Sequence, residues 1–201
     1  MYKHFFKRFF DILFSLAGLL FLAPILFIIA ILIKTTSKGR IFYRQIRVGK
    51  DNKDFYLLKF RTMKENADKS GLLTVGNHDN RITKIGYYLR KTKADELPQL
   101  LNVLKGEMSI VGPRPEVRKY VNYYTEQQRN VLLVRPGLTD IASIAYIDEN
   151  EILAQAENPE QTYIEKIMQE KLSLNFEYIA HISLRYDVRI VCETLFRIIW
   201  K

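Results

Sequence analysis

The stretch ILFSLAGLLFLAPILFIIAILI, residues 12–33, runs for 22 residues without a charged side chain. As a helix it would be about 33 Å long, at about 1.5 Å per residue, and the hydrocarbon core of a bilayer is about 30 Å thick. A cleavable signal peptide has a shorter apolar region of about 7–15 residues and a small-residue cleavage site, which is not found here. The stretch therefore predicts a membrane segment.

The charges around this stretch bear on how it enters the membrane. Both of its ends are flanked by basic residues: Lys3, Lys7 and Arg8 before it, and Lys34, Lys38, Arg40, Arg44 and Arg47 after it. The positive-inside rule cannot hold at both ends of a span. Pro24 lies near the middle, where it removes a backbone hydrogen bond and bends a helix. We expect a re-entrant helix-break-helix, and the alternative is a single span with a tolerated proline kink.

Length and composition indicate one further domain. The chain has 201 residues, of which 48% are hydrophobic, and this is enough to bury a core. We divide it into residues 1–38, the membrane-associated re-entrant helix, and residues 39–201, a soluble domain that ends in amphipathic helices. The expected fold class is α/β, a small, mainly helical soluble domain with a short β-hairpin.

The net charge of +9 is unevenly distributed. Residues 1–135 hold 25 basic and 11 acidic side chains, so this part is expected to face phosphate or anionic lipid. The single cysteine, Cys192, excludes an intramolecular disulfide, and the absence of an Asn-x-Ser/Thr acceptor agrees with a cytosolic domain. Because its neighbours are apolar, we expect Cys192 to be a small buried thiol and not a nucleophile.

A hairpin is predicted directly after the membrane segment. Residues 41–46 and 55–61 read as strands on either side of a turn-rich stretch. Strand alternation places Lys59 and Arg61 on one face as a paired cationic spot. The alternative is that both cations merely protect an edge strand from aggregation.

Turn and cap signals organise the middle of the chain. Residues 64–80, with Gly71 and Gly76, read as a loop that leads into a helix near residues 82–90. Residues 92–95 have capping-box spacing, and Asp95 is expected to cap a helix over 96–104, with Pro98 in its first turn and Gly106 past its end.

Two proline-containing turns follow this helix. Pro113 and Pro115 restrict the Arg114 backbone to extended conformations, so this arginine is preorganised. Arg135-Pro136-Gly137 forms a second rigid turn. From Tyr163 onward, apolar residues recur at helical spacing and predict amphipathic helices.

Several common chemistries lack their motifs. The chain contains no G-x-x-x-x-G-K-[ST], G-x-G-x-x-G, G-x-S-x-G or H-E-x-x-H, which argues against nucleotide hydrolases, dinucleotide-binding enzymes, serine hydrolases and zinc proteases. His4, His78 and His181 lack metal-ligand spacing. An oxygen-ligated Mg²⁺ remains open, because it needs only one or two carboxylates and substrate phosphates.

Asp95 and Glu96 are the best catalytic candidates. A carboxylate at a helix start, near Arg90 and other cations, is expected to be ionised and to lie where phosphate binds. Asp95 could attack phosphorus, Glu96 could hold Mg²⁺, and Lys59, Arg61 and Arg114 could bind phosphate oxygens. The alternative is that Asp95 is only a helix cap and Glu96 an exposed acid.

Taken together, the motifs resemble the bacterial sugar transferase family, the monotopic phosphoglycosyl transferases. The resemblance covers nearly the whole chain and rests on the motifs KRFFD at 7–11, KFRTM at 59–63, residues 81–90 with Gly86, DELPQL at 95–100, NVLKG at 102–106, GPRP at 112–115 and RPGLT at 135–139. It implies an α/β catalytic domain anchored by a re-entrant helix at the cytoplasmic face of the bacterial inner membrane.

The resemblance also implies a reaction and a site. Sugar 1-phosphate would pass from a nucleotide diphospho-sugar, expected to be UDP-linked, to polyprenyl (undecaprenyl) phosphate through a covalent intermediate on Asp95, with release of UMP. Glu96 would be the Mg²⁺-associated partner, and the expected metal ligands are Glu96 and Asp95. The expected substrate-binding residues are Lys59, Arg61, Arg90, Pro113, Arg114 and Arg135. The product would start polysaccharide, lipopolysaccharide or glycoprotein assembly.

Two stretches depart from the family pattern. Ala23 replaces the serine that often precedes the membrane-helix proline, so a break at Pro24 lacks the support of that hydroxyl. Residues 140–145, DIASIA, replace a Gly-Trp-Ala-Gln-Val-Asn-like stretch, which leaves the sugar unassigned.

Three other functions are compatible with parts of the sequence. A membrane-associated glycosyltransferase would move only the sugar, but the chain has no Asp-x-Asp. A basic membrane-tethered protein could instead bind nucleic acid or anionic lipid without chemistry, and a structural subunit of a polysaccharide complex is a third alternative. The enzyme interpretation involves anionic headgroups of the bilayer but no nucleic acid, and it is compatible with a homodimer.

Overall fold

The structure is a computed structural model that describes residues 2–64, 67 and 80–200. It is mostly helical, with two small two-stranded sheets. In chain order the elements are η1 (Tyr2–Phe6), α1 (Lys7–Thr36), β1 (Phe42–Val48), η2 (Lys50–Asn52), β2 (Asp54–Phe60), α2 (Lys84–Lys91), η4 (Ala94–Glu96), α3 (Gln99–Lys105), β3 (Ser109–Val111), α4 (Arg118–Val121), η5 (Gln128–Leu133), β4 (Gly137–Thr139), α5 (Ile141–Ala145), α6 (Glu149–Ala154), α7 (Pro159–Thr162), η6 (Tyr163–Ile167), α8 (Met168–Ala180) and α9 (Leu184–Ile199). Most of the predicted loop at 64–80, with Gly71, Gly76 and His78, lies outside the described residues.

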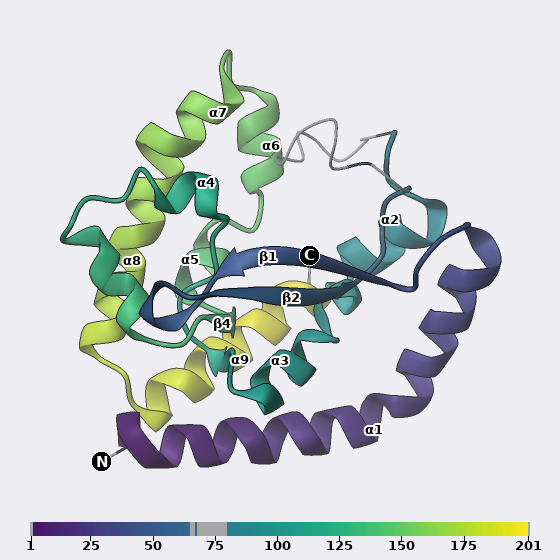
Figure 1. Cartoon of the computed structure of the whole chain (residues 1–201), viewed down its shortest axis with the longest axis horizontal. Helices are drawn as coiled ribbons and strands as arrows, with labels where there is room; N and C mark the ends of the chain where they lie inside the picture. The colour runs from purple at the N-terminus through teal and green to yellow at the C-terminus, as the bar shows by residue number, and fades with distance from the viewer. Residues whose placement is uncertain (1, 65–66, 68–79, 201) are drawn as a thin grey trace.

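Helix α1 dominates the shape of the molecule. Within the described part of the chain it is the one helix long and apolar enough to cross a membrane, and few of its side chains are buried. Figure 1 shows it running along one side of the domain and then bending sharply. The predicted helix-break-helix is therefore wrong in one respect, because the helix contains Pro24 and bends but stays continuous. A proline removes a single hydrogen bond, and the turns on either side can carry the helix past it.

Both arms of α1 dock on the same domain. At the amino-terminal arm, Lys7 Nζ lies 2.6 Å from the Asp187 carboxylate at the start of α9. At the other end, Arg61 Nη2 donates to the carbonyl and hydroxyl oxygens of Ser37, at 2.8 and 2.6 Å. Near that end Ile33 is buried in a cluster that includes Phe60 of β2. The two ends of the apolar helix therefore lie against one body.

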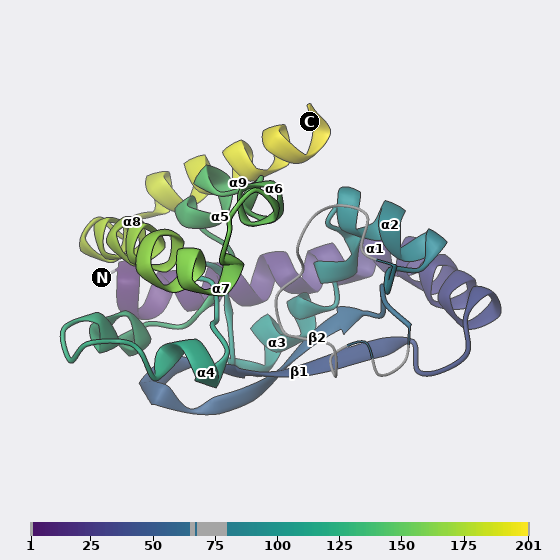
Figure 2. The same cartoon turned by 90° about the horizontal axis from the view of Figure 1, so that it is seen from above.

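The predicted hairpin is confirmed, with its strand ends shifted by one or two residues. Strands β1 and β2 are antiparallel, and their register runs from Phe42 opposite Phe60 to Val48 opposite Asp54. Figure 2 shows the hairpin on one side of the molecule, with α5, α6, α8 and α9 on the other. The cavity described below lies between these two layers.

A parallel pair of short strands, β3 and β4, was not predicted. Ser109 pairs with Gly137 and Val111 with Thr139. A Cβ added at Gly137 would lie 2.2 Å from the amide nitrogen of Gly112, so the two backbones approach as closely as only glycine allows. The predicted turn at residues 135–137 therefore leads directly into a strand.

The segment between α2 and α3 differs from the prediction. The predicted helix near 82–90 is present as α2, which Thr83 caps. Asp95, however, caps no helix, because it lies in the single turn η4 and α3 starts only at Gln99, with Pro98 at its N-cap position. Thr92 forms no capping box either, since its hydroxyl donates backwards to the Tyr88 carbonyl at 2.9 Å. Gly106 ends α3 with φ +88°, as predicted.

The predicted amphipathic helices are present as α8 and α9. Tyr163, Ile167 and Leu172 belong to a core cluster beneath α4 and α8. The predicted burial of Cys192 is wrong, because its side chain is exposed. Ile190 is buried in α9. Cys192 follows it by two positions, which is about 200° around the helix axis, so its side chain lies on the opposite, exposed face.

Candidate active site

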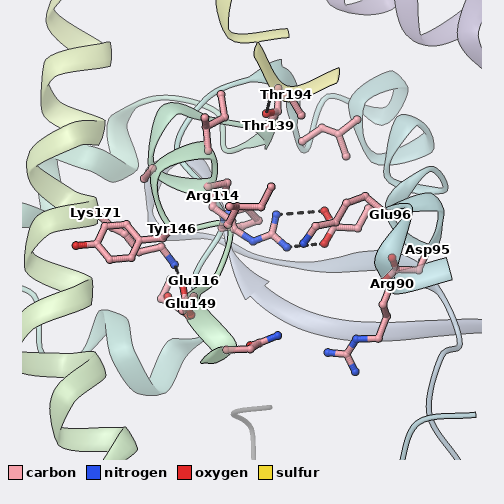
Figure 3. A pocket seen from close by; sticks show the side chains of 18 of the residues that line it. Arg90, Asp95, Glu96, Arg114, Glu116, Thr139, Tyr146, Glu149, Lys171 and Thr194 are labelled. Carbon is pink, nitrogen blue, oxygen red and sulfur yellow. Dashed lines mark hydrogen bonds and ion pairs between the residues drawn. The ribbon is translucent and has the colours of Figure 1, made fainter. Parts of the chain in front are cut away.

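A cavity of about 750 Å³ opens between the hairpin layer and the helices α5, α6, α8 and α9. One end is formed by Arg90, Asp95 and Glu96, toward which Arg114 points, and the opposite side by Tyr146, Glu149 and Lys171 (Figure 3). Lys59 also lines the cavity and contacts Glu96. The two halves of the chain meet at this cavity. Basic side chains outnumber acidic ones among its lining residues, as an anionic ligand requires.

Asp95 and Glu96 lie side by side in η4. The turn is set by Lys93, a non-glycine residue in the left-handed region with φ +55°, whose carbonyl accepts the Glu96 N–H at 3.1 Å. Such a conformation costs about 1–2 kcal/mol in a residue other than glycine. Both carboxyl groups are buried, with residue exposures of 7% and 9%.

Glu96 is held by two cations. Arg114 makes a forked contact, with Nη2 2.6 Å from Oε1 and Nη1 3.2 Å from Oε2. Lys59 Nζ donates to Oε1 at 2.9 Å. Burial by itself would raise the pKa of Glu96, but Arg114 and Lys59 outweigh it and hold that pKa well below its usual range. Glu96 is therefore a fixed, ionised group.

Asp95 is in a different state. Burial, together with the neighbouring Glu96 charge, raises the pKa of Asp95 above its ordinary value, although Lys59 opposes this effect. Its Oδ1 atom is buried and has no hydrogen-bond partner among the residues that the structure describes. The expectation that the surrounding cations and a helix dipole would lower this pKa is wrong, because desolvation outweighs the cations and no helix starts at Asp95. An unsatisfied buried carboxylate has raised free energy and can react with an incoming group.

Arg114 reaches Glu96 from a braced segment of backbone. It lies between Pro113 and Pro115, and the Pro113 carbonyl accepts the Gly137 N–H at 2.9 Å. The Pro115 carbonyl accepts Arg47 Nη1 at 2.9 Å. The prediction that this arginine is preorganised is thus supported by hydrogen bonds on both of its neighbours.

The structure brings together only part of the predicted substrate-binding set. Lys59, Arg90 and Arg114 line the cavity with the acidic pair. Arg61 does not, since it contacts Ser37 at the end of α1, so the predicted cationic spot shared by Lys59 and Arg61 is not formed. The final strand position before Arg61 is Phe60, and beyond it the face alternation no longer applies.

Two other predicted residues have mainly backbone partners. Arg135 Nε donates to the Gly106 carbonyl at 2.9 Å, at the end of α3 and outside the lining of the cavity. Pro113 restricts the backbone next to Arg114, and its carbonyl is hydrogen-bonded to Gly137. It is not among the residues that line the cavity.

Sequence reasoning missed a partly buried group of side chains next to Arg114. Arg47 Nη1 lies 3.4 Å from Glu116 Oε1, and the Tyr163 hydroxyl donates to Glu116 Oε2. Glu116 and Arg47 are 69 residues apart, so no local pattern could have joined them. Glu116 is the last residue of the PRPE motif at 113–116, and this motif is the only local feature of the sequence that draws attention to it.

The far wall of the cavity was also missed. Glu149 of α6 is paired with Lys171 of α8. The hydroxyl oxygens of Thr139 and Thr194 lie 2.5 Å apart where α9 covers the cavity. Asn175 lines the cavity, and its buried Oδ1 has no hydrogen-bond partner in the described part of the chain. This wall therefore offers polar groups at a distance from the acidic pair.

The described residues contain no group of three or more His, Cys, Asp or Glu side chains that could hold a metal ion by themselves. The donor set at Asp95 and Glu96 nevertheless fits Mg²⁺ in one respect, because Asp95 Oδ1 is a buried carboxylate oxygen to which no described residue donates a hydrogen bond. Mg²⁺ commonly uses one or two carboxylates and completes its shell with water and substrate phosphates. The residues present fit a magnesium ion that is shared with a phosphorylated ligand.

Comparison with known proteins gives a consistent result. A model of the bacterial sugar transferase family matches residues 2–201. The UDP-N-acetylgalactosamine-undecaprenyl-phosphate N-acetylgalactosaminephosphotransferase of Aeromonas hydrophila is 37% identical over 194 residues, which are 95% of this chain and 43% of the relative. The UDP-glucose:undecaprenyl-phosphate glucose-1-phosphate transferase of Klebsiella pneumoniae is 38% identical over 197 residues, 96% of this chain and 40% of the relative.

A third relative is similar in length. The exopolysaccharide production protein PSS of Rhizobium leguminosarum bv. phaseoli is 37% identical over 198 residues, which are 94% of this chain and 92% of the relative. By contrast, the chain spans about two fifths of the length of the Aeromonas and Klebsiella relatives.

Proposed function

The chain belongs to the bacterial sugar transferase family, and on this basis we propose that it transfers a sugar 1-phosphate from a UDP-sugar to undecaprenyl phosphate. The names of the Aeromonas and Klebsiella relatives support both substrate classes. The observation that carries the proposal is the buried Asp95–Glu96 pair, at the cationic end of a cavity large enough for a nucleotide sugar.

The proposed reaction has two displacements at one phosphorus atom. An Asp95 carboxylate oxygen attacks the phosphorus that bears the sugar, and the bond from that phosphorus to the bridging oxygen breaks, so UMP leaves with the electron pair. An oxygen of undecaprenyl phosphate then attacks the same phosphorus and Asp95 leaves. The product is undecaprenyl diphosphate sugar, and the enzyme is regenerated without any external base.

The surrounding side chains suit this chemistry. Arg114 and Lys59 keep Glu96 ionised and present positive charge beside Asp95, where negative charge develops on the phosphoryl oxygens. The raised pKa of Asp95 accompanies a more basic carboxylate, which is a better nucleophile once it is ionised. Arg90, at the same end of the cavity, is proposed to bind the diphosphate (Figure 3).

We propose that Mg²⁺ is held by Asp95 and Glu96 together with the diphosphate. When bound, it would neutralise charge on the phosphate oxygens and assist departure of the nucleotide. Lys59, Arg90 and Arg114 already place positive charge around the pair and would repel a further cation. The negative charge of the bound nucleotide would offset this repulsion and favour binding of Mg²⁺.

We propose a monotopic, re-entrant attachment of α1 to the cytoplasmic face of the bacterial inner membrane. Support comes from the docking of both arms of α1 on one domain, through Lys7 at one end and Ser37 at the other. A straight span would carry these two ends to opposite sides of a core about 30 Å thick. The basic residues on either side of the segment would then face the same anionic headgroups.

Product analysis tests the proposed function. The full-length protein in nanodiscs is incubated with Mg²⁺, undecaprenyl phosphate and each of several UDP-sugars, and both the lipid and the nucleotide products are identified by mass spectrometry. The proposal predicts a lipid diphosphate sugar and UMP, and Asp95→Asn should abolish both. Release of UDP with a lipid monophosphate sugar would show transfer of the sugar alone, and absence of both products with every donor would refute the proposal.

A further inference from the structure

Asp11 is a buried carboxylate in the long apolar helix α1. Its exposure is 5%, whereas nearby Phe9 and Leu13 are 53% and 46% exposed. Its Oδ1 atom accepts the backbone N–H of Ile110 at 3.0 Å. Burying a carboxylate is costly unless it is hydrogen-bonded, so this contact offsets part of the cost of burying Asp11.

Asp11 accepts this hydrogen bond at the edge of β3 that does not pair with β4. Strand β3 pairs with β4, and on that side the Ser109 N–H donates to the Pro136 carbonyl at 2.8 Å. Successive N–H groups of a strand point in opposite directions, so the Ile110 N–H points away from β4 and toward α1. Asp11 therefore takes the place of a second neighbouring strand.

A second connection fixes the next residue of β3. Lys7 Nζ and the Tyr2 hydroxyl each lie 2.6 Å from Asp187 Oδ2. On the other oxygen of Asp187, the Tyr178 hydroxyl lies at 2.7 Å, and this hydroxyl is also 3.2 Å from the Val111 carbonyl. The amino-terminal arm of α1 thus contacts Ile110 directly, through Asp11, and is linked to Val111 through Asp187 and Tyr178.

The position of β3 determines where Arg114 begins. Val111 ends the strand, and only Gly112 and Pro113 separate it from Arg114, whose Nη2 lies 2.6 Å from Glu96. Ile110 itself lines the cavity. A shift of β3 would be transmitted to the Arg114–Glu96 contact, because the proline-flanked segment is too restricted to absorb it.

We propose that Asp11 is a positioning residue: by holding β3 it places Arg114 on Glu96, which makes the membrane helix part of the active-site scaffold as well as an anchor. The effect on the reaction rests on the proposed function. The effect on β3 does not, because it concerns a hydrogen bond within the folded protein.

Three variants of the full-length protein in nanodiscs test this inference. Asp11→Ala removes the acceptor, while Asp11→Asn keeps an acceptor oxygen of the same size. Ser15→Ala is the matched control, because Ser15 lies one turn further along the helix and is 0% exposed, and its buried hydroxyl has no hydrogen-bond partner within residues 2–64, 67 and 80–200. The readouts are amide hydrogen exchange at Ile110, the rate at saturating UDP-sugar, the KM for the donor, and vesicle flotation.

In Asp11→Ala we expect exchange at Ile110 to accelerate at least tenfold and the rate at saturating donor to fall about 10–100-fold, as for a small misplacement of a catalytic group. Flotation should remain unchanged. Asp11→Asn and Ser15→Ala should stay within about threefold of the wild type in both rates. Wild-type protection of Ile110 in Asp11→Ala, or a loss above tenfold in folded Asp11→Asn, would overturn the inference.

The variants separate this inference from the proposed function. If Asp11→Ala does not fold, folded Asp11→Asn still decides the outcome, because retention of its Ile110 protection and rate supports the acceptor role. Absence of turnover in the wild type would refute the proposed function, while the exchange at Ile110 would still test the hydrogen bond.

Discussion

Replacing Arg114 by methionine removes the forked contact with Glu96 and keeps most of the apolar stem of the side chain. Glu96, whose side chain is 11% exposed, then retains only Lys59 among the two cations that contact it in the described structure. A carboxylate left with fewer partners in a buried position destabilises the fold.

The size of the effect follows from the geometry. The lost contacts are two charge-assisted hydrogen bonds of 2.6 and 3.2 Å, and such bonds contribute about 1.5–3 kcal/mol each when buried. The Arg114 side chain is 31% exposed, so water recovers part of that energy. We expect a net loss of about 2 kcal/mol in the free energy of unfolding, which lowers the Tm by about 4–8 °C in a chain of this size.

The loss of function should be larger than the loss of stability. Without Arg114 the transferred phosphoryl group loses a positive charge, and removal of one such group typically lowers the rate about 100–1,000-fold. The Tm is measured by scanning fluorimetry in detergent, and the rate by release of UMP. Arg114→Lys should recover part of the stability but little of the rate, because lysine cannot form the fork.

Arg118 provides the matched control. It pairs with Asp54 at 2.5 Å, but the two side chains are 36% and 49% exposed. Arg118→Met should therefore change the free energy of unfolding by less than about 0.5 kcal/mol and leave the rate unchanged. Equal effects of the two substitutions, or an Arg114→Met protein with wild-type rate and Tm, would refute the assigned role of Arg114.

Three further predictions follow from the same structure. Because Lys59 opposes the raised pKa of Asp95, Lys59→Met should raise that pKa further and move the acid limb of the pH–rate profile to higher pH; an unmoved or lowered limb contradicts this. Gly86→Ala would place a Cβ 2.0 Å from the Thr62 carbonyl oxygen and should lower the free energy of unfolding by about 1–3 kcal/mol, which thermal melting measures. The control is Gly18→Ala, whose Cβ would meet only an ordinary contact at 3.4 Å. Equal Tm values for the two variants would contradict the close packing of α2 on Thr62. Lys93→Gly should relieve the left-handed conformation at φ +55° and raise the Tm by about 1–3 °C, and a lower Tm would contradict the strain at this turn.

The features predictable from sequence were those with a strong local signal. The position of α1 follows from an uncharged run, the β1–β2 hairpin follows from two strands around a turn, and Gly106 marks the end of α3. Asp95 and Glu96 were found because they are adjacent in the chain. Arg114 was found because prolines flank it.

The remaining features depend on contacts between distant segments. Strands β3 and β4 have three residues each, which is too short for a periodic pattern, and their pairing appears only when residues 109 and 137 meet. Arg61 and Arg135 are basic residues in suggestive motifs, yet their partners are oxygens of Ser37 and Gly106. The local sequence shows that these side chains are positively charged, but it does not show which groups they contact in the folded chain.

The state of Asp95 was mispredicted for a related reason. Its neighbours in sequence are mostly cationic, which favours an ionised carboxyl group, but the folded chain buries the residue and places Glu96 beside it. Burial is a property of the tertiary structure, and here it outweighs the nearby charges.

The central claim, that Asp95 becomes covalently phosphorylated by the donor, is tested most directly by intact-protein mass spectrometry. Purified full-length protein is mixed with Mg²⁺ and each UDP-sugar without lipid acceptor, next to Asp95→Asn. We predict a mass gain of one phosphosugar in the wild type, mapped to the peptide that contains Asp95, and no gain in the variant. Release of UMP that requires undecaprenyl phosphate, with no adduct from any donor, would show direct transfer and contradict this claim.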